Sequence, residues 1–321
     1  MGKFGLGIDI GGTFTDIVLY DGAARIQFSH KQLTTPEDPT EGVMTGIAHL
    51  LQGAGIDPGA IFRVVHATTL FTNALIERRG AKAGLITTAG FRDVLEIGRE
   101  RKYELYDITI QKPVPLIPRH LRAEVPERMD VSGAVVVPLD EDALVETARE
   151  LIAKGATSLA IVFLHSYANP AHELRAITVL AKACPGVALS ASVDVAPEIR
   201  EYERTSTTAC NAYIKPLAER YLGRLTERLN DAGISADLLM MLSNGGLTNV
   251  TEASRVPVQL LESGPAAGAL AAAFLAAGDG GEHVLAFDMG GTTAKLSVID
   301  HGAPKITYSF EAARAKRFIE G

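Results

Sequence analysis

The residues best suited to chemistry occur in two matched segments of the sequence. In each segment an apolar run ends at an aspartate, and a glycine pair and a threonine follow after one further residue. The first aspartate is Asp9 and the second is Asp288. The copies align without a gap, because the interval from Asp9 to Asp21 equals the interval from Asp288 to Asp300. A repeat of this kind predicts two similar domains that face each other.

The residue types in this repeat suit the binding of a polyphosphate. A glycine pair lets the backbone turn with its N–H groups exposed, which forms a concavity for anions. Threonine hydroxyls can donate hydrogen bonds to phosphate oxygens, and aspartates can hold Mg²⁺ or orient a nucleophile. We therefore predict that Asp9 and Asp288 are catalytic and bind the metal. The predicted phosphate-binding residues are Gly11, Gly12, Thr13, Thr15, Gly290, Gly291, Thr292, Thr293 and Lys295.

One such segment alone would most often be an ordinary hairpin turn. Two segments in register, each on apolar strands and each followed by threonine, favour a functional pair. In this interpretation the two hairpins hold a polyphosphate from opposite sides.

A second group of candidates follows a predicted strand end. His66 lies there, and open α/β sheets bind ligands beyond their strand ends, so His66 is a catalytic candidate. Thr69 and Asn73 are placed to hold a polar substrate or a phosphate. By residue type alone, however, a single histidine is more often a hydrogen-bonded structural residue.

A predicted helix start provides a third group. Free N–H groups and the helix dipole favour anions at such a position. Ser263 is the expected N-cap, Ser263 and Gly264 are predicted to bind the cofactor, and Glu262 is predicted to lie near the metal. The turn at residues 243–246 keeps two interpretations, a plain turn or a set of backbone donors at the cleft.

The other charged clusters are interpreted as surface. Arg99, Arg101 and Lys102 are expected to form a solvated face, with binding of a substrate carboxylate as the alternative. Surface ion pairs, or a polar patch that links the domains, are expected for Glu198, Arg200, Glu201 and Arg204.

The elements that must position these groups follow from the apolar pattern. Three short stretches joined by glycine turns predict an antiparallel meander over residues 4–10, 14–20 and 25–31. Beyond Thr40 the pattern changes to the alternating strands and helices of an α/β fold. Strands are predicted at residues 63–67, 83–87, 159–164, 187–193, 238–242, 258–261 and 305–310. Helices are predicted from Thr40 and over residues 69–79, 139–154, 170–183, 205–231 and 265–277.

Composition argues against several functional classes. The chain has 321 residues, enough for two domains, and its net charge of −7 predicts neither a nucleic-acid face nor binding to an anionic membrane. Cys184 and Cys210 form neither a metal set nor a disulfide framework, which fits a reducing cytoplasm. Polar residues interrupt the most apolar run, residues 257–277, so no membrane span is predicted.

The sequence at the two hairpins resembles the actin, Hsp70 and sugar-kinase superfamily. More narrowly, it is similar to the N-terminal part of the hydantoinase A and 5-oxoprolinase family. The resemblance covers nearly the whole chain and is carried by residues 7–16, 66–69, 73–77, 84–93, 197–206, 243–246, 262–268 and 287–295. It implies an α/β protein with a duplicated ribonuclease-H-like (actin-like ATPase) fold, the second copy incomplete at the C-terminus.

The resemblance also implies a domain division. A hydantoinase A N-terminal domain with the first phosphate loop is expected over residues 1–195. The start of a hydantoinase/oxoprolinase domain with the second loop is expected over residues 196–321. Members of the family are typically much longer, so we expect a shortened piece of such a protein or one half of a split gene.

By resemblance the expected reaction is the ATP-dependent hydrolysis of a cyclic amide, such as hydantoin, 5-oxoproline or a related lactam, through phosphorylation of the amide oxygen. ATP and Mg²⁺ are the implied cofactors, a hydantoinase B-like subunit is the implied partner, and self-association is a further option. Two alternatives stay open: a subunit of an ATP-dependent carboxylase of acetone or acetophenone, and a non-catalytic nucleotide-binding half of a split enzyme. A sugar kinase is a weaker rival. The sequence does not name the substrate.

Overall fold

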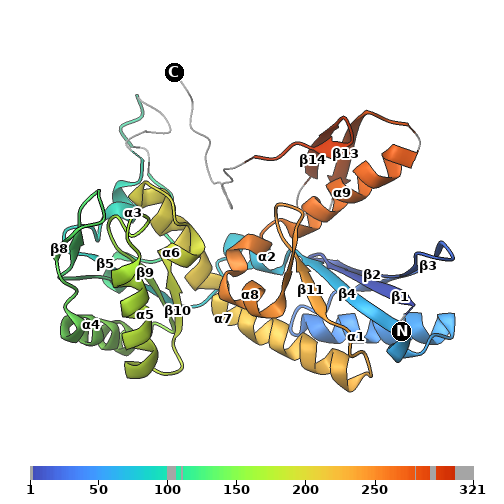
Figure 1. The fold of residues 1–321 in the computed structure, drawn as a ribbon, viewed down its shortest axis with the longest axis horizontal. Coiled ribbons are helices and arrows are strands. Elements are labelled where there is room, and N and C mark those ends of the chain that lie inside the picture. The colour runs from blue at the N-terminus through green and yellow to red at the C-terminus, as the bar shows by residue number, and fades with distance from the viewer. Residues whose placement is uncertain (1–2, 100–105, 110, 279, 290–293, 308–321) are drawn as a thin grey trace. The chain divides into compact units, whose positions relative to one another are not determined.

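The computed structural model describes residues 3–99, 106–109, 111–278, 280–289 and 294–307. The chain divides into two compact units (Figure 1). Unit 1 comprises Met1–Asn73 and Ala218–Phe310, and unit 2 comprises Ala74–Leu217 and Glu311–Gly321. Each unit is described by itself below.

Unit 1 is built on a six-stranded sheet with the strand order β12-β11-β4-β1-β2-β3. The strands β1 and β4 are parallel, as are β4 and β11, whereas β2, β3 and β12 pair antiparallel to their neighbours. The central strand β1 therefore ends at the same edge as its parallel neighbour β4. The strand bounds are β1 Phe4–Ile10, β2 Phe14–Asp21, β3 Ile26–Leu33, β4 Ile61–Thr68, β11 Leu238–Met241 and β12 Leu247–Asn249.

The predicted meander is confirmed, and its alternating apolar residues form the core. Leu6, Ile8, Ile17 and Leu19 are fully or almost fully buried, because every second side chain of β1 and β2 points to the same face. The helix α1, Pro39–Ala54, packs against β2 and β3. Its N-cap is Asp38, whose carboxylate accepts a hydrogen bond from the Thr40 N–H at 3.1 Å, so the predicted helix start is confirmed.

The second hairpin of unit 1 consists of β13, His283–Met289, and β14, Ala294–Asp300. The helix α9, Ser263–Gly278, packs on it (Figure 1). The predicted third strand at residues 305–310 is wrong where it is described, because residues 305–307 lie in no strand. The hairpin is instead extended by the short β15, Ala303–Pro304. Residues 308–310 lie outside the described part of the chain.

Unit 2 is built on a four-stranded sheet in which every pair is parallel, with the order β10-β9-β5-β6. The bounds are β5 Ala83–Thr88, β6 Arg122–Val125, β9 Ser158–Val162 and β10 Ala188–Ala191. The helices α4, Glu141–Ala153, and α5, Ala171–Ala183, bury Leu144 and Leu180 in one core cluster with the sheet residues Ile86 and Ile161. Sheets covered in this way consist of continuous apolar runs, and β9 is buried along its whole length.

The opposite face of this sheet is covered by the long helix α7, Glu201–Asp231, and by the chain between β5 and β6. Leu85 of the sheet packs in one core cluster with Ile117 and with Ala209 of α7. The other short helices and strands of the chain are α2 Leu70–Ile76, α3 Val94–Ile97, β7 Arg128–Met129, β8 Val135–Val137, α6 Ser192–Val195 and α8 Val250–Arg255, and two 3₁₀ turns lie at Pro58–Ala60 and Arg119–Leu121. None of the described helices is both long enough and apolar enough to cross a membrane.

Two predicted strands are corrected by the structure. The segment at 187–193 leaves the sheet after Ala191, where α6 begins. The segment at 258–261 forms a 3₁₀ turn, Pro257–Leu260, instead of a strand. In that turn Pro257 occupies the first position and has no N–H to give to a strand ladder, while Leu260 is buried. A short apolar run alone does not distinguish these conformations.

Gly80 is the glycine of unit 2 whose replacement we expect to destabilise the fold most. A Cβ atom there would lie 2.1 Å from the Tyr213 ring and 2.7 Å from the Tyr213 carbonyl oxygen. The Gly80→Ala variant is therefore expected to lose about 2–3 kcal/mol of stability. In Gly53→Ala, the control, the new Cβ meets nothing within 4 Å, and the expected change is a gain of up to about 1 kcal/mol. Urea unfolding midpoints check both results, and an unchanged midpoint for Gly80→Ala would contradict the packing described.

Candidate functional site

Asp9 lies near the end of β1, beside Asp16, its cross-strand partner on β2. Although its side chain still reaches solvent, the surrounding protein displaces much of its hydration. This loss of hydration raises the pKa of Asp9 to about 6, and the negative charges of Asp16 and Asp288 add to the rise. The positive charges of Lys31 and Lys295 act in the opposite direction.

These interactions bring the two predicted hairpins together in unit 1. Asp288 and Lys295 are cross-strand neighbours on β13 and β14, and both act electrostatically on Asp9 at the end of β1. The ion pair of Lys295 with Glu262 gives the geometry behind this interaction, because Glu262 lies two residues before Gly264 and a Cβ atom on Gly264 would lie 3.4 Å from an Asp9 carboxylate oxygen. The predicted phosphate-binding residues Gly290, Gly291, Thr292 and Thr293 lie outside the described residues.

The first turn of α9 also approaches Asp9. A Cβ atom on Gly264 would lie 3.4 Å from an Asp9 carboxylate oxygen and 3.7 Å from the Thr69 methyl group. No side chain therefore separates the positive end of this helix from the carboxylate of Asp9. The residue before the helix, Glu262, has a φ of 62°, which is uncommon for a residue other than glycine.

Glu262 connects the two hairpins to this helix end. Its carboxylate forms an ion pair with Lys295 of β14. Its backbone N–H donates a hydrogen bond to the Thr72 hydroxyl at 3.3 Å. Three elements, α2, α9 and β14, thus meet at one residue beside Asp9.

Ser263 has a different position from the one predicted. The helix begins at Ser263 itself, so the expectation that Ser263 is its N-cap is wrong. The side chain is fully buried, and its hydroxyl accepts from the Thr68 N–H and donates to the Thr68 carbonyl, both at 3.1 Å. The serine thereby ties α9 to the end of β4. Any contact of Ser263 with a nucleotide would have to use its backbone N–H.

The first hairpin turn exposes part of the predicted loop and buries the rest. Gly12 and Thr13 are exposed, and the Gly11 N–H closes the turn by donating to the Phe14 carbonyl at 2.9 Å. Thr15 is fully buried, 3.1 Å from the Thr34 hydroxyl. Since Thr34 donates in turn to the Gly11 carbonyl at 3.0 Å, Thr15 supports the loop from behind.

His66 is fully buried in β4. Its Nδ1 lies 3.1 Å from the Ile8 carbonyl and its Nε2 lies 2.7 Å from the Tyr221 hydroxyl of α7. Burial lowers the pKa of His66 to about 4, so the ring is neutral near pH 7, with Nδ1 donating and Nε2 accepting. This geometry makes His66 a support for β1 at Ile8 and does not favour the predicted catalytic role.

Removing the Tyr221 hydroxyl tests this supporting role. In Tyr221→Phe the buried Nε2 of His66 loses its donor, and the expected loss of stability is about 1–3 kcal/mol. The measurement is the urea unfolding midpoint, with Tyr20→Phe, an exposed tyrosine on β2, as the control. Equal midpoints for wild type and Tyr221→Phe would contradict the described bond.

Of the remaining candidates, the turn and one arginine have ordinary structural roles, and a second arginine is buried instead of exposed. The turn at residues 243–246 is closed by its own bonds, with the Gly246 N–H donating to the Asn244 side chain at 2.8 Å, as in a plain Asx turn. Arg99 pairs with Glu203 at 2.7 Å, and Arg101 and Lys102 lie outside the described residues. Arg204, interpreted as surface, is only 1% exposed, so that interpretation is wrong.

Asp16 and Lys31 are functional candidates that the sequence analysis missed. They form an ion pair at 2.7 Å on the strands that follow the first loop, and both act on Asp9. The register of a tight hairpin would have identified Asp16, since the residue paired with Asp9 can be counted across the turn.

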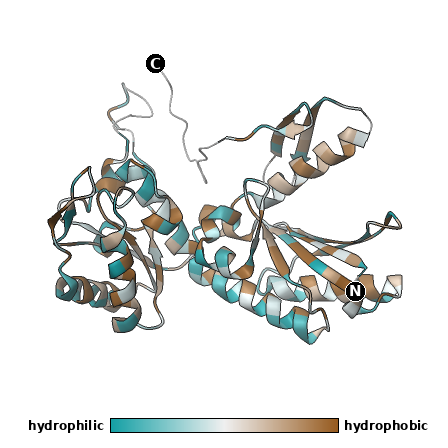
Figure 2. Cartoon of the chain, in the orientation of Figure 1, coloured by the Kyte–Doolittle hydropathy of each residue, from teal (hydrophilic) through white to brown (hydrophobic). Residues whose placement is uncertain are grey.

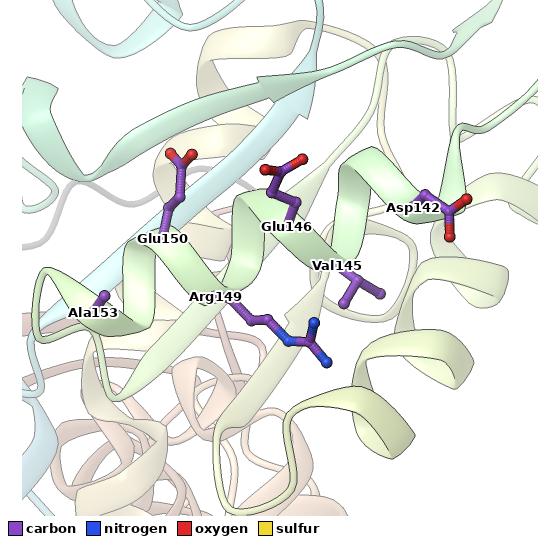
Figure 3. A pocket seen from close by; sticks show the side chains of 6 residues that line it. All are labelled: Asp142, Val145, Glu146, Arg149, Glu150 and Ala153. Atoms are coloured by element: carbon purple, nitrogen blue, oxygen red, sulfur yellow. The ribbon is translucent and has the colours of Figure 1, made fainter.

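A surface hollow elsewhere in the protein is lined by a single helix, whereas several elements bring side chains together around Asp9. It lies in unit 2 on one face of α4, where Asp142, Glu146, Arg149 and Glu150 point outward from successive turns (Figure 3). All of its lining residues belong to this helix, so no second element brings a group to face them.

Comparison with known proteins gives consistent matches over the whole chain. The model of the hydantoinase/oxoprolinase N-terminal region matches residues 5–184, and the hydantoinase/oxoprolinase model matches residues 204–319. An uncharacterized protein of Methanocaldococcus jannaschii is 42% identical over 98% of this chain and 47% of its own length. Caprolactamase subunit alpha of Pseudomonas jessenii is 36% identical over 94% of this chain and 44% of its own length.

Two solved structures share the fold. The crystal structure of the ATP-dependent caprolactamase of Pseudomonas jessenii superposes with a TM-score of 0.81 over 92% of this chain and 43% of that chain, at 36% identity. A nucleotide-free structure of acetone carboxylase superposes with a TM-score of 0.83 over 95% of this chain and 46% of that chain, at 28% identity. The chain spans a little under half the length of these relatives. With both family models matched in order along it, the chain belongs to the hydantoinase/oxoprolinase family.

Proposed function

We propose that this chain carries the ATP-binding loops of an enzyme that opens a cyclic amide with hydrolysis of ATP. The observation that supports this proposal best is the meeting of Asp9, Asp288 and Lys295 at the first turn of α9. Carboxylates, a lysine and a helix N-terminus are the groups that phosphoryl transfer requires. Exposed backbone at Gly12 and Thr13 adds donors for phosphate oxygens.

The proposal includes the fold expected from the resemblance, a duplicated ribonuclease-H-like core. The meander β1-β2-β3 would belong to the first copy and the hairpin β13-β14 to the second. We keep the division into domains at residues 1–195 and 196–321 as part of this proposal. A cytoplasmic location is also part of it, because ATP is a cytoplasmic cofactor and both cysteines are free.

The residues around Asp9 fit a divalent cation of the Mg²⁺ type. Loss of hydration and the negative charges of Asp16 and Asp288 disfavour the charged form of Asp9, which a cation would stabilise, and oxygen ligands are those that Mg²⁺ prefers. Asp9 and Asp288 would hold the ion, which would neutralise charge on the phosphates. Lys295 and the exposed first loop would hold the phosphate oxygens themselves.

The chemistry follows from the stability of an amide. Resonance makes its carbonyl a poor electrophile, so water opens a lactam ring slowly. Transfer of the γ-phosphoryl group from ATP to the amide oxygen would release ADP and make the carbon reactive enough for one water to add. The C–N bond of the ring would then break as the nitrogen takes up a proton, and a second water would release inorganic phosphate from the acyl phosphate that remains. The products are an amino carboxylate, ADP and inorganic phosphate. In this proposal Asp9 would orient the attacking oxygen, and the loops would stabilise the transferring group.

An ATPase assay with a panel of cyclic amides tests the proposal. We expect phosphate release that depends on hydantoin, 5-oxoproline or ε-caprolactam and is matched by ring opening in equal amount. The assay is run on the chain alone and with a hydantoinase B-like subunit added. ATP hydrolysis that no cyclic amide stimulates in either case would contradict the proposed reaction.

A second candidate is a subunit of an ATP-dependent ketone carboxylase. The TM-score of 0.83 with acetone carboxylase supports this reading. ATP hydrolysis that requires bicarbonate together with a ketone, rather than a lactam, would favour it.

A third candidate is a nucleotide-binding half that needs a complement. Its support is the second hairpin, where Leu285, Phe287, Met289 and Leu296 are between 61% and 71% exposed. Hydrophobic residues occur along both strands of this hairpin (Figure 2). Adjacent apolar side chains so exposed mark a surface that another element covers. Turnover absent from the chain alone and restored by a second polypeptide would favour this candidate, and such a subunit or a second copy of the chain is the partner we propose.

A further inference from the structure

The open end of the second hairpin carries a cluster of histidines and carboxylates that plays no part in the proposed function. His283 begins β13, and its cross-strand partner Asp300 ends β14. His301 follows in the turn toward β15, and Glu282 directly precedes β13. Asp288 lies at the other end of β13 (Figure 1), about 17 Å away for an extended strand, so the cluster is separate from the site proposed for phosphoryl transfer.

Three potential metal ligands converge in this cluster. One ligand atom from each of Glu282, His283 and His301 lies within 4.8 Å of the other two. The two imidazole rings are edge to face, with their centres 5.0 Å apart. Imidazole nitrogens together with a carboxylate oxygen are a ligand set that Zn²⁺ binds in proteins, whereas Mg²⁺ prefers oxygen ligands alone.

Asp300 orients both rings. Its Oδ1 accepts a hydrogen bond from Nδ1 of His283 at 2.8 Å and lies 3.1 Å from Nδ1 of His301. With Nδ1 donating, the Nε2 of each neutral ring is the atom whose lone pair can bind a metal. A carboxylate that accepts the other ring N–H is the usual outer partner of a metal-binding histidine. The hydrogen bond from His283 also lowers the pKa of Asp300, which keeps this partner ionised.

The cluster is open to solvent and can close around an ion. The side chains of His283 and His301 are 69% and 74% exposed. Two ligands of a tetrahedral Zn²⁺ lie roughly 3.4 Å apart, so movements of about an ångström by these side chains would complete the geometry. Asp300 already restricts both rings, which reduces the entropy lost when they bind. Lys305 contacts the other carboxylate oxygen of Asp300, at 3.6 Å, and so leaves Oδ1 to the rings.

We propose that the two histidines and Glu282 bind a Zn²⁺ ion at the open end of this hairpin. Asp300 is the outer partner that fixes the orientation of both rings. Three protein ligands leave the fourth tetrahedral position to water. The negative charges of Glu282 and Asp300 match the charge of the ion. The bound ion would link the start of β13 to the turn after β14 and so hold the two ends of the hairpin together.

Calorimetric titration of the chain with ZnCl₂ in excess MgCl₂ tests the proposal, because Mg²⁺ competes at sites made of carboxylates alone. We expect saturable binding of a single Zn²⁺ per chain. Asp300→Asn, which removes only the outer partner, is expected to weaken this binding roughly tenfold or more. His283→Gln and His301→Gln each remove a ligand and should weaken it further. Both histidines are exposed, so these variants should fold, and circular dichroism verifies this.

His49→Gln is the matched control. His49 and His30 form another edge-to-face pair of rings, with centres 5.4 Å apart, but the described residues bring no third ligand to them. This variant is expected to bind Zn²⁺ as wild type does. Co²⁺ gives a second measurement, since the visible absorption of a tetrahedral Co²⁺ site should appear with wild type and His49→Gln and be lost in His301→Gln.

Several outcomes would overturn the proposal. Zn²⁺ affinity that is equal in wild type and His301→Gln would place the ion elsewhere, as would the absence of saturable binding under these conditions. Equal weakening in His49→Gln and His301→Gln would show unspecific binding to paired histidines. An unchanged affinity in Asp300→Asn would contradict the role assigned to that carboxylate.

Discussion

Replacing Asp9 by asparagine is expected to lower ATP-dependent turnover about a hundredfold or more, while the protein stays folded. Asparagine keeps the size of the side chain but removes the charge that would hold the metal and orient the attacking oxygen. Folding should not suffer, because loss of hydration and the charges of Asp16 and Asp288 disfavour the Asp9 carboxylate more than Lys31 and Lys295 favour it. Phosphate release measures turnover, and circular dichroism verifies the fold.

The matched control for this variant is Asp57→Asn, which removes an exposed carboxylate from unit 1 outside the site. It is expected to turn over ATP as wild type does. A fall in turnover of less than threefold for Asp9→Asn would contradict the assigned role of Asp9. Such a fall corresponds to a change of roughly 0.6 kcal/mol in the activation free energy.

The raised pKa of Asp9 also predicts how stability changes with pH. The folded pKa of about 6 lies above the ordinary value of 3.8, so protonation of Asp9 favours the folded state. The contribution of protonated Asp9 to the free energy of unfolding is fully present below about pH 3.8 and is lost as the pH rises through about 6. The melting temperature of Asp9→Asn minus that of wild type should therefore rise between pH 4 and 7. The size of this rise is set by the difference between the folded pKa of about 6 and the ordinary pKa of 3.8. His66 acts in the opposite direction, because its pKa is lowered, but it is common to both proteins and cancels in the comparison. A difference that does not vary with pH would contradict the environment described for Asp9.

Replacing Lys295 by methionine is the second change with a large expected effect. Lys295 pairs with Glu262 and acts on Asp9, so it is the described cation best placed to meet phosphate oxygens at this site. Loss of a charge-assisted contact is expected to weaken Mg-ATP binding roughly tenfold or more. The same change should raise the pKa of Asp9 further, because the positive charge of Lys295 lowers it.

Lys305→Met is the control for this prediction. Lys305 follows the same hairpin but is exposed and pairs with Asp300 at 3.6 Å, away from Asp9. Calorimetry with Mg-ATP compares the two variants. Equal weakening in both would show a general loss of positive charge instead of a specific contact at Lys295.

The local fold around the site was predictable from the sequence because its signals are local. The glycine turns and alternating apolar residues of the first three strands specify a meander, and the structure has it with bounds that differ by at most two residues. The repeat around Asp9 and Asp288 also predicted two hairpins, and strands flank both. These features depend on residues close to one another in the chain.

The parts that could not be predicted depend on contacts between distant segments. The buried ring of His66 is hydrogen-bonded to the Ile8 carbonyl and to the Tyr221 hydroxyl, and Tyr221 lies on a helix far along the chain. Ser263 looks like a helix cap in sequence, but β4 takes up its hydroxyl. Arg204 stands among charged residues typical of a surface, and only the packing of α7 against unit 2 buries it. Side-chain type gave no signal of these tertiary partners.

The measurement that tests the central claim most directly is Mg-ATP binding by calorimetry to wild type, Asp9→Asn, Asp288→Asn and the double variant. If the two hairpins form one site, wild type binds with micromolar affinity, each single variant loses most of that affinity, and the double variant is hardly worse than either. Micromolar binding retained by either single variant, or losses that simply add in the double variant, would contradict a shared site.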